Sequence, residues 1–343
     1  MTWIPIADPA YICGHGAPYR AGIRPGTENR LIVAFDGGGV SWSAYTAARA
    51  ITGQPASKED DLYYTVLPED PTGFENRGGI FSSEEWNYFR GWNIALVCYA
   101  TGDLHIGCAD FPYVSTDGKQ TVLHHHGYRN YRLVLEKARE LCSNPEKILI
   151  TGVSAGGFGA AALADDVART FPKCEDITVC VDGAMLCGDL KTIAEKIWKA
   201  PAEICDRIQS ENVISDWLTA LHREQGSRIR CMFACSVRDA ALSWFQSAFS
   251  GQVPPAFTQK SGELFQENLK CMCKTLQAEN PDIGLFLYDT PAGGIDPLLK
   301  LTQHTLLWDS NFKDRDWTKT KCSALDWLWN GVNGRCYHIG LEL

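Results

Sequence analysis

The stretch "KILITGVSAGGFGAAAL", residues 147–163, decides the fold of this chain. Its first residues are aliphatic or β-branched, which is typical of a buried strand, and its row of alanines favours a helix. Between the two lies Gly152-Val153-Ser154-Ala155-Gly156, a glycine-rich turn from strand to helix. Two interpretations are open at this point. Ser154 is either an exposed nucleophile on a sharp turn, or one small residue in a helix that packs closely on a sheet.

Short apolar strands alternate with helical stretches along the rest of the chain, which predicts an α/β fold with a mostly parallel central sheet and helices on both faces. The expected strands are residues 30–36, 93–99, 147–152, 176–183, 227–236 and 283–289. The expected helices are residues 130–142, 155–171, 261–279 and 323–332. Residues 52–79 are polar and rich in turn residues, and we expect them to form a long surface excursion.

The whole chain, residues 1–343, is interpreted as one domain. Residues 188–228 are mainly helical, which is more than a minimal crossover between two strands needs. We interpret this segment as a helical cap or side insertion.

The charge of the chain argues against several classes of partner. Its formal net charge is −9, and no cluster of Lys and Arg is visible, so neither nucleic acid nor an anionic membrane surface is an expected partner. No apolar run approaches the roughly 20 residues that span a bilayer. Residues 1–16 lack the basic and apolar regions of a signal peptide, so we expect a cytoplasmic protein. The oligomeric state is left open.

No metal site or cofactor is expected. The chain has 14 cysteines, and several stand in apolar runs where buried free thiols are common. Cys271 and Cys273 form a C-x-C pair without a matching cluster of zinc ligands. In "LHHHGYRN", residues 123–130, consecutive histidines should point in different directions, and no carboxylate motif accompanies them. We interpret that stretch as a loop that leads into a helix.

If Ser154 is a nucleophile, it needs a base, which we expect to follow it in the chain. In α/β-hydrolases the order is Ser, then Asp or Glu, then His. Three histidines follow Ser154. His222 lies in a predicted helix and His338 in the C-terminal tail, whereas His304 lies after the last predicted strand. His304 is therefore the predicted general base.

The acid that orients the base has two candidates. Asp239 follows the strand 227–236, one strand before the one that leads to His304, as the order requires. Asp182 ends the strand 176–183, one strand earlier, and its alternative role is to bind loop backbone. We favour Asp239 and keep Asp182 as the alternative.

An oxyanion hole needs two backbone N–H donors aimed at one point. Ala155, the residue after the serine, is the first expected donor. The second is expected at Gly38 or Gly39 in "FDGGGVSW", residues 35–42, where glycines allow a close approach of the substrate. A phosphate-binding loop is the weaker alternative for this segment, because the Lys-Ser/Thr of such loops is missing.

Three further residues are candidates for substrate contact. Asp103 and His105 follow the strand 93–99 and should lie near the carboxyl edge of the sheet, where they would either contact substrate or brace a loop. Trp42, at the end of the glycine-rich segment, is the third candidate.

The order of these segments resembles the pectin acetylesterase family, to which Notum-type deacylases belong, and is most similar to its bacterial-type members. The similar segments are "CGHGAPYRAGIRPG" (13–26), "FDGGGVSW" (35–42), "GGIFSSEEWNYFRGWNIALVCYATGDLHIG" (78–107), "ITGVSAGGFGA" (150–160), "SVRDAALSWF" (236–245) and "LTQHTLLW" (301–308). The resemblance implies an α/β-hydrolase-like fold and hydrolysis of carboxylic esters without a cofactor. It assigns nucleophile, acid and base to Ser154, Asp239 and His304.

The chain departs from the family pattern at two places near the expected pocket. Val40 and Ser41 stand before Trp42, and "VDGAML" (181–186) replaces an expected Gly-Asp-Ser-Gly. The predicted function is a serine esterase that removes an acetyl or other acyl group from a carbohydrate or similar alcohol. A lipid-type or protein deacylase with the same triad is the first alternative, and a catalytically silent binding module on the same fold is the second.

Overall fold

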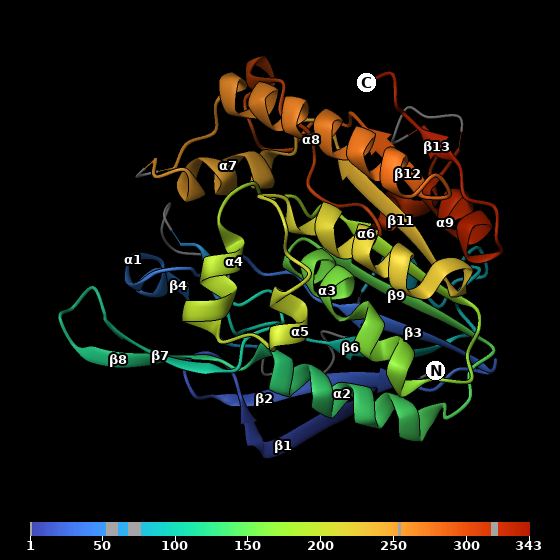
Figure 1. Cartoon of the computed structure of the whole chain (residues 1–343), viewed down its shortest axis with the longest axis horizontal. Helices are drawn as coiled ribbons and strands as arrows, with labels where there is room; N and C mark the ends of the chain where they lie inside the picture. The colour runs from blue at the N-terminus through green and yellow to red at the C-terminus, as the bar shows by residue number, and fades with distance from the viewer. Residues whose placement is uncertain (1, 53–60, 68–76, 253–254, 317–321) are drawn as a thin grey trace.

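The computed structural model describes residues 2–52, 61–67, 77–252, 255–316 and 322–343. A nine-stranded sheet in the order β1-β2-β6-β3-β9-β10-β11-β12-β13 forms its centre (Figure 1). β1 pairs antiparallel with β2 and β2 with β6, and all other neighbours are parallel. The strands are β1 (Ile4–Ile12), β2 (Pro18–Arg24), β3 (Arg30–Phe35), β6 (Asn93–Val97), β9 (Lys147–Val153), β10 (Ile177–Asp182), β11 (Ile229–Ser236), β12 (Gly284–Tyr288) and β13 (His338–Ile339).

The central strands are covered on both faces, which explains their almost continuous apolar sequence. Every residue of β10 is buried, and in β9 only Lys147 is not. The alternation of side chains along β11 shows how the two faces are covered. Cys231 Sγ lies 3.9 Å from Leu218 O on α6 (Val213–Gln225), whereas Arg230 Nε donates to Gly331 O on α9 (Ala324–Val332). Since successive residues of a strand point to opposite faces, α6 and α9 lie on opposite sides of the sheet.

The remaining helices extend these two layers. α2 (Gly127–Leu141) and α3 (Ala155–Thr170) lie on the same side of the sheet as α6, the side that Figure 1 presents to the viewer, and α3 contacts α6. α8 (Gln259–Glu279) packs against α6 and α7 (Ala240–Phe249). The predicted α/β fold with a mostly parallel sheet and helices on both faces is confirmed. Shorter elements are α1 (Ala44–Ala47), β4 (Ala50–Ile51), β5 (Tyr63–Tyr64), β7 (Ala109–Val114) and β8 (Gln120–His125).

The segment 188–228, interpreted from sequence as a cap or side insertion, contains several short helices. They are α4 (Leu190–Ile193), the π-helical turn η3 (Ala194–Trp198), α5 (Ala202–Cys205) and α6. α6 packs against α3 and β11, so this helix belongs to the layer that covers the sheet. A separate role for the preceding short helices as a cap stays a prediction.

Two parts of the fold differ from the sequence interpretation. The antiparallel strands β1 and β2 extend the sheet at its edge, and Pro5 and Pro9 in "IPIADPAYI" hide this strand character, since proline is tolerated only on edge strands. The expected surface excursion 52–79 lies partly outside the described residues. Within it, Leu62 and Tyr63 are buried, so this part of the excursion packs into the molecule.

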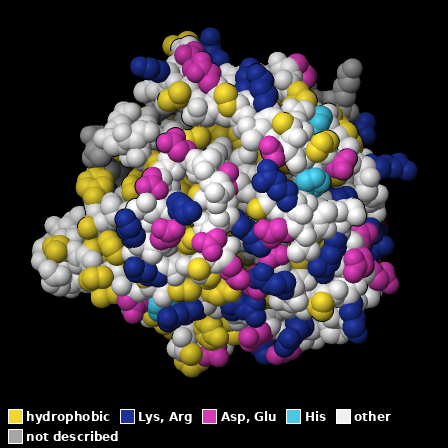
Figure 2. Space-filling view, viewed as in Figure 1, with side chains coloured by type: hydrophobic (Ala, Val, Ile, Leu, Met, Phe, Trp, Pro, Cys, Tyr) yellow, Lys and Arg dark blue, Asp and Glu magenta, His cyan; other side chains and the backbone are white. Residues whose placement is uncertain are grey.

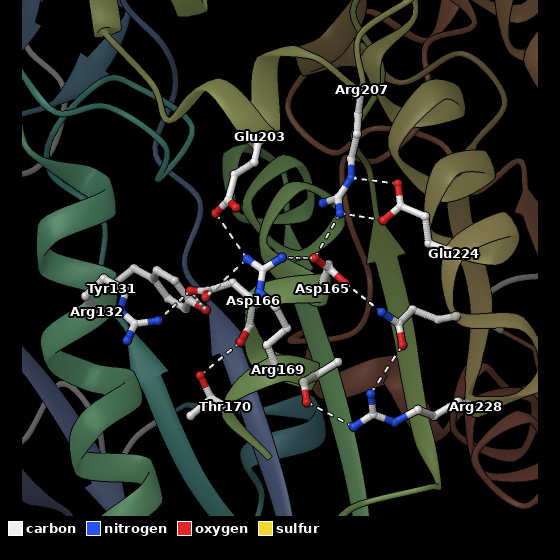
Figure 3. A network of polar contacts seen from close by, with 12 residues as sticks. Tyr131, Arg132, Asp165, Asp166, Arg169, Thr170, Glu203, Arg207, Glu224 and Arg228 are labelled. Atoms are coloured by element: carbon white, nitrogen blue, oxygen red, sulfur yellow. Dashed lines mark hydrogen bonds and ion pairs between the residues drawn. The ribbon is translucent and has the colours of Figure 1, made fainter. Parts of the chain in front are cut away.

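Two acidic residues of α3 anchor a polar network that joins this helix to its neighbours (Figure 3). Asp165 Oδ2 lies 2.8 Å from Arg207 Nη2, and its Oδ1 accepts a hydrogen bond of 2.7 Å from Gln225 Nε2. Asp166 Oδ2 accepts a hydrogen bond of 2.7 Å from Arg132 Nη1 on α2. The helix that carries the alanine and glycine run is therefore held from both sides by charged contacts as well as by close packing.

The surface and the cysteines agree with an ordinary globular chain. On the face shown in Figure 2, basic and acidic side chains are interspersed and form no large patch of one sign. None of the described helices is long and apolar enough to cross a bilayer. All cysteines are free thiols, and only Cys271 is exposed. Burial raises the pKa of thiols such as Cys231 and Cys273 to about 12, so these groups are uncharged.

Candidate active site

Ser154 stands at a sharp turn between β9 and α3. Its backbone has φ 57° and ψ −127°, a conformation that L-residues rarely adopt and that costs about 1–3 kcal/mol. The neighbouring glycines are required by space. A Cβ on Gly152 would lie 2.0 Å from Gly156 O, and a Cβ on Gly156 would lie 2.0 Å from Phe35 O. The sequence pattern Gly-x-Ser-x-Gly is thus explained by the closeness of the turn to its own helix and to β3.

His304 and Asp239 form a hydrogen-bonded pair. His304 Nδ1 lies 2.8 Å from Asp239 Oδ2, and the Asp239 carboxylate is fully buried. Asp239 is also the N-cap of α7, because its Oδ1 accepts the backbone N–H of Leu242 at 2.9 Å. Burial lowers the pKa of His304, but the charge and hydrogen bond of Asp239, with the charge of Asp182, raise it by more. The net pKa of His304 therefore lies above its ordinary value.

Thr302 joins the two segments that carry this pair. Its backbone N–H donates to Arg238 O at 3.0 Å, and its carbonyl accepts the N–H of Ala240 at 2.9 Å. The hydroxyl of Thr302 accepts the backbone N–H of Arg238 and donates to Ser236 Oγ, each at 2.9 Å. The residues on either side of Asp239 are therefore fixed to the chain two positions before His304.

Asp182, the alternative acid, has a different set of contacts. Its Oδ2 accepts the backbone N–H groups of Leu306 and Leu307, each at 2.8 Å. Burial raises its pKa to about 6, although the hydrogen bonds from these N–H groups lower it. Its backbone carbonyl accepts the N–H of Ser154 at 2.9 Å. The geometry pairs His304 with Asp239 and gives Asp182 contacts to loop backbone.

Ser154 and His304 line one open cavity of about 520 Å³. The glycine-rich segment after β3 and the side chains of α7 form much of its wall. Its lining residues are Asp36, Gly37, Gly38, Gly39, Ile51, Asp61, Leu62, Tyr64, Val153, Ser154, Ala241, Trp244, Phe245, Phe257, His304 and Thr305. Apart from the two carboxylates and the histidine, the wall is built from glycine, aliphatic and aromatic residues, with the hydroxyls of Ser154, Tyr64 and Thr305.

The glycine-rich segment lies directly beside Ser154. A Cβ on Gly37 would lie 2.9 Å from Ser154 Cβ, and a Cβ on Gly39 would lie 1.9 Å from Leu62 O. Gly39 also has φ +80°, which favours glycine. Within the described chain, the N–H groups of Gly38, Gly39 and Ala155 donate to no other residue. Gly38 and Gly39 line the cavity, and Ala155 directly follows Ser154, which also lines it.

The three predicted substrate-contact residues lie outside this cavity. Asp103 is buried and accepts hydrogen bonds from the Thr101 hydroxyl at 2.7 Å and from the Gly127 N–H at 2.7 Å. His105 is buried with its Nε2 2.8 Å from Asp36 O, and burial lowers its pKa to about 4. Both side chains brace the loop after β6, which was the second role expected for them.

Trp42 lines a smaller neighbouring cavity of about 200 Å³. Its ring packs edge-on against the ring of Phe249, with 5.3 Å between the ring centroids. It does not line the cavity of Ser154.

Several lining residues escaped the sequence analysis. Leu62 and Tyr64 lie in the polar stretch that was expected at the surface, and Trp244 and Phe257 lie in and after a helix with no visible link to the serine. Asp36 did carry a signal, because it directly precedes the glycines. It forms an ion pair with Arg77, with 2.7 Å between Oδ2 and Nη2.

One group outside the cavity has the chemistry of a metal site. Asp110, His124 and His126 come together on β7, on β8 and just before α2. Their ligand atoms lie within 4.8 Å of one another. The sequence analysis expected no metal site here, because it found no carboxylate beside the histidines.

Comparisons with known proteins agree with this fold. A family model described as pectinacetylesterase matches residues 18–242, which include Gly38, Ser154 and Asp239. Among solved structures, the Wnt deacylase Notum from Drosophila is similar, with a TM-score of 0.63, 14% identity, and 98% of this chain and 95% of that chain covered. At this identity the likeness concerns the fold, which is α/β-hydrolase-like as expected. No curated protein sequence matches the chain. The family match covers most of the chain, and this protein therefore belongs to the pectinacetylesterase family of carboxylic ester hydrolases.

Proposed function

We propose that this protein is a serine esterase in which Ser154, His304 and Asp239 form the catalytic triad. The observation that carries the proposal is that the His304–Asp239 pair lies at the same cavity as the strained Ser154 turn. Ser154 Oγ attacks the ester carbonyl while His304 Nε2 takes its proton. The buried Asp239 carboxylate holds the imidazole with Nδ1 protonated and stabilises the imidazolium that forms.

The tetrahedral oxyanion is stabilised by backbone N–H groups. Ala155 provides one donor at the start of α3, where the helix dipole also favours negative charge. The second donor is Gly38 or Gly39, whose N–H groups stand at the cavity. Loss of one such donor typically lowers kcat by about 10²–10³. His304 then protonates the leaving alcohol, and water attacks the acyl-enzyme by the same route in reverse.

The substrate that we propose is a neutral ester of a carbohydrate or similar alcohol, with an acetyl or other acyl group. Aromatic side chains such as Tyr64, Trp244 and Phe257 at the cavity suit the flat apolar faces of a sugar ring as well as an acyl chain. Asp36 and Asp61 are the ionisable carboxylates of the described wall, and the residues that line it include no Lys or Arg. This charge balance favours a neutral alcohol portion.

A lipid-type or protein deacylase is the second candidate. The largely apolar wall, with Leu62, Phe245 and Phe257, is the observation that favours an acyl group longer than acetyl. A series of nitrophenyl esters from acetate to decanoate separates the two. A kcat/KM that rises with chain length supports the deacylase, and a sharp fall beyond acetate or propionate supports the acetylesterase.

The catalytic proposal as a whole is tested by labelling with a fluorophosphonate and by Ser154→Ala. We expect the wild type to be labelled once and to hydrolyse nitrophenyl acetate. Ser154→Ala should lose both properties, whereas Ser143→Ala, which changes an exposed serine, should keep them. A folded wild type that takes no label and shows no turnover would identify a silent binding module instead.

A further inference from the structure

The hairpin formed by β7 and β8 gathers three metal-ligating side chains away from the catalytic cavity. Asp110 stands opposite His124 in the strand register. Asp110 Oδ1 lies 2.7 Å from His124 Nδ1 and 2.8 Å from His126 Nε2. Asp110 is largely exposed, with 62% of its side-chain surface accessible, while His126 is mostly buried. One carboxylate oxygen is thus shared by two imidazoles at a position open to solvent.

Strand alternation explains this arrangement. His124 and His126 are two residues apart and point to the same side, whereas His125 between them points inward. His125 is buried, with its Nδ1 2.8 Å from Thr101 O. The carboxylate that the local sequence lacks comes from the neighbouring strand, 14 residues before His124. Inspection of "LHHHGYRN" alone therefore misses the third ligand.

We propose that Asp110, His124 and His126 bind one divalent first-row transition-metal ion, with Zn²⁺ as the best match to the donor set. Two imidazole nitrogens and one carboxylate oxygen are an established zinc combination that leaves a fourth position for water. Zinc–ligand bonds of about 2.0–2.2 Å place tetrahedral ligand atoms about 3.3 Å apart. The distances of 2.7 and 2.8 Å from Asp110 Oδ1 to the two imidazole nitrogens need to lengthen by only about 0.5 Å to reach this spacing.

The bound ion would fasten the hairpin at its base. It would join β7, β8 and the residue before α2, since His126 is the N-cap of that helix. The hairpin projects beyond the sheet in Figure 1, and its side chains Tyr113 and Leu123 pack in one small cluster with Leu62 and Tyr63. Leu62 also lines the catalytic cavity. The ion would therefore stabilise a segment that supports the cavity wall.

Charge sets the expected strength of this site. With one carboxylate, a divalent ion leaves the site with one net positive charge, and the N-terminus of α2 adds partial positive charge nearby. Arg129 stands in the first turn of that helix. We therefore expect an exchangeable site, weaker than a closed structural zinc site with four protein ligands.

The test is a Zn²⁺ titration of the chelator-treated full-length protein, followed by calorimetry and by thermal unfolding. The variants are His124→Ala and Asp110→Asn, and the matched control is His222→Ala, which changes a partly exposed histidine outside the cluster. All variants keep the same cysteines, so binding to thiols is equal in each and cancels in the comparison. Circular dichroism without Zn²⁺ checks that every variant folds, and Asp110→Asn changes only an exposed side chain.

We expect the wild type and His222→Ala to bind one more Zn²⁺ than the two site variants, and to gain a higher unfolding midpoint with Zn²⁺. The affinity of Asp110→Asn should fall by more than about tenfold, because even the outer partners of metal ligands change affinity by that factor. The proposal would be overturned if wild type and His124→Ala bound the same number of Zn²⁺ ions, or if Zn²⁺ raised their unfolding midpoints equally. The cluster would then be only two histidines hydrogen-bonded to one carboxylate.

Discussion

The side chain of Asp182 accepts the backbone N–H of Leu306 at 2.8 Å, a contact between residues 124 positions apart. The same carboxylate oxygen accepts the N–H of Leu307, and the carbonyl of Asp182 accepts the N–H of Ser154. Asp182 thus connects the turn of Ser154 to the loop that carries His304. Its role in the fold is to position that loop, while Asp239 touches the imidazole.

This division between the two carboxylates predicts different effects of substitution. Asp239→Asn should lower kcat by about 10⁴ with little loss of stability, because the amide no longer holds the required tautomer of His304. Asp182→Asn keeps an acceptor oxygen and should remain active. Asp182→Ala should destabilise the fold by about 1–3 kcal/mol for each buried N–H that it leaves unpaired.

Steady-state kinetics with nitrophenyl acetate and urea unfolding measure the two effects separately. A loss of activity in Asp182→Asn as large as in Asp239→Asn would contradict the assignment of the acid.

The pH dependence of the reaction should report the raised pKa of His304. The base acts in its neutral form, so kcat/KM should fall on acidification, with a midpoint above the ordinary value of 6.5. Asp239→Asn removes the negative charge that favours the imidazolium, and its residual activity should show a midpoint at lower pH. Asp314→Asn, which changes a partly exposed carboxylate next to Lys313, should leave the midpoint unchanged.

The same shift has a consequence for stability. A raised pKa in the folded state means that protonated His304 is stabilised by folding. This contribution is fully present below the unfolded pKa and is lost as the pH rises through the folded pKa. The free energies of unfolding of wild type and His304→Gln from pH 6 to 8 measure this contribution. The advantage of the wild type should shrink as the pH rises, and an advantage that grows would contradict the raised pKa.

The glycines around Ser154 should not tolerate even one methyl group. Gly156→Ala would place a Cβ 2.0 Å from Phe35 O, so the backbone has to move. Overpacking of this kind typically costs about 1–3 kcal/mol, and the displaced turn should also lower kcat. Gly293→Ala is the matched control, since a Cβ there meets no atom within 4 Å. Urea unfolding and kcat of the pair test this; equal stability of both variants would refute the steric explanation of the motif.

The network of α3 predicts a strong effect far from the cavity (Figure 3). Asp165 is 4% exposed, and removing it by Asp165→Ala leaves Arg207 without this partner. Arg207 keeps its ion pair with Glu224, so the expected cost is that of the lost hydrogen bonds of Asp165, about 1.5–3 kcal/mol for a bond to a charged group. Glu140→Ala, which removes an exposed ion pair with Lys137, should leave the midpoint of urea unfolding unchanged.

The change in the free energy of unfolding at acid pH gives a second measure of this network. Burial raises the pKa of Asp165, but the hydrogen bond and charge of Arg207, with the charge of Arg169, lower it by more. The stability that this depressed pKa represents is present above the unfolded pKa and is lost as the pH falls through the folded pKa. The free energy of unfolding should therefore fall more on acidification in the wild type than in Asp165→Ala. An equal fall in both proteins would show that the ionised form of Asp165 contributes no stability.

The parallel part of the fold and the chain order of the site were predictable because both depend on local patterns. Buried parallel strands are continuous apolar runs, and parallel strands end at one edge, so residues such as Ser154 and Asp239 that follow strands come to the same edge. The steric demand at Gly152 and Gly156 is also local. These features need no knowledge of contacts between distant segments.

The cavity wall and the hairpin were not predictable, because both depend on packing between segments that the sequence does not mark. Tyr64 belongs to a polar, turn-rich stretch, yet the structure packs it beside Gly38. The sequence left two roles open for Asp103, substrate contact or support of a loop, and its three hydrogen-bond donors are visible only in the structure. The carboxylate beside His124 belongs to Asp110 on the paired strand, and no local sequence pattern indicates this pairing.

The hydrogen bonds of Thr302 and Asp182 distinguish the residues that hold His304 in place from those that only line the cavity. The carbonyl of Asp182 accepts the N–H of Ser154, and its carboxylate accepts the N–H groups of Leu306 and Leu307. Thr302 bonds to the residues on both sides of Asp239. Leu62, Trp244 and Phe257 stand at the cavity but make none of these bonds. Substitutions at those three positions can therefore alter which ester fits while His304 keeps its orientation. Related proteins with this fold can differ in substrate without any change in the residues that hold the base.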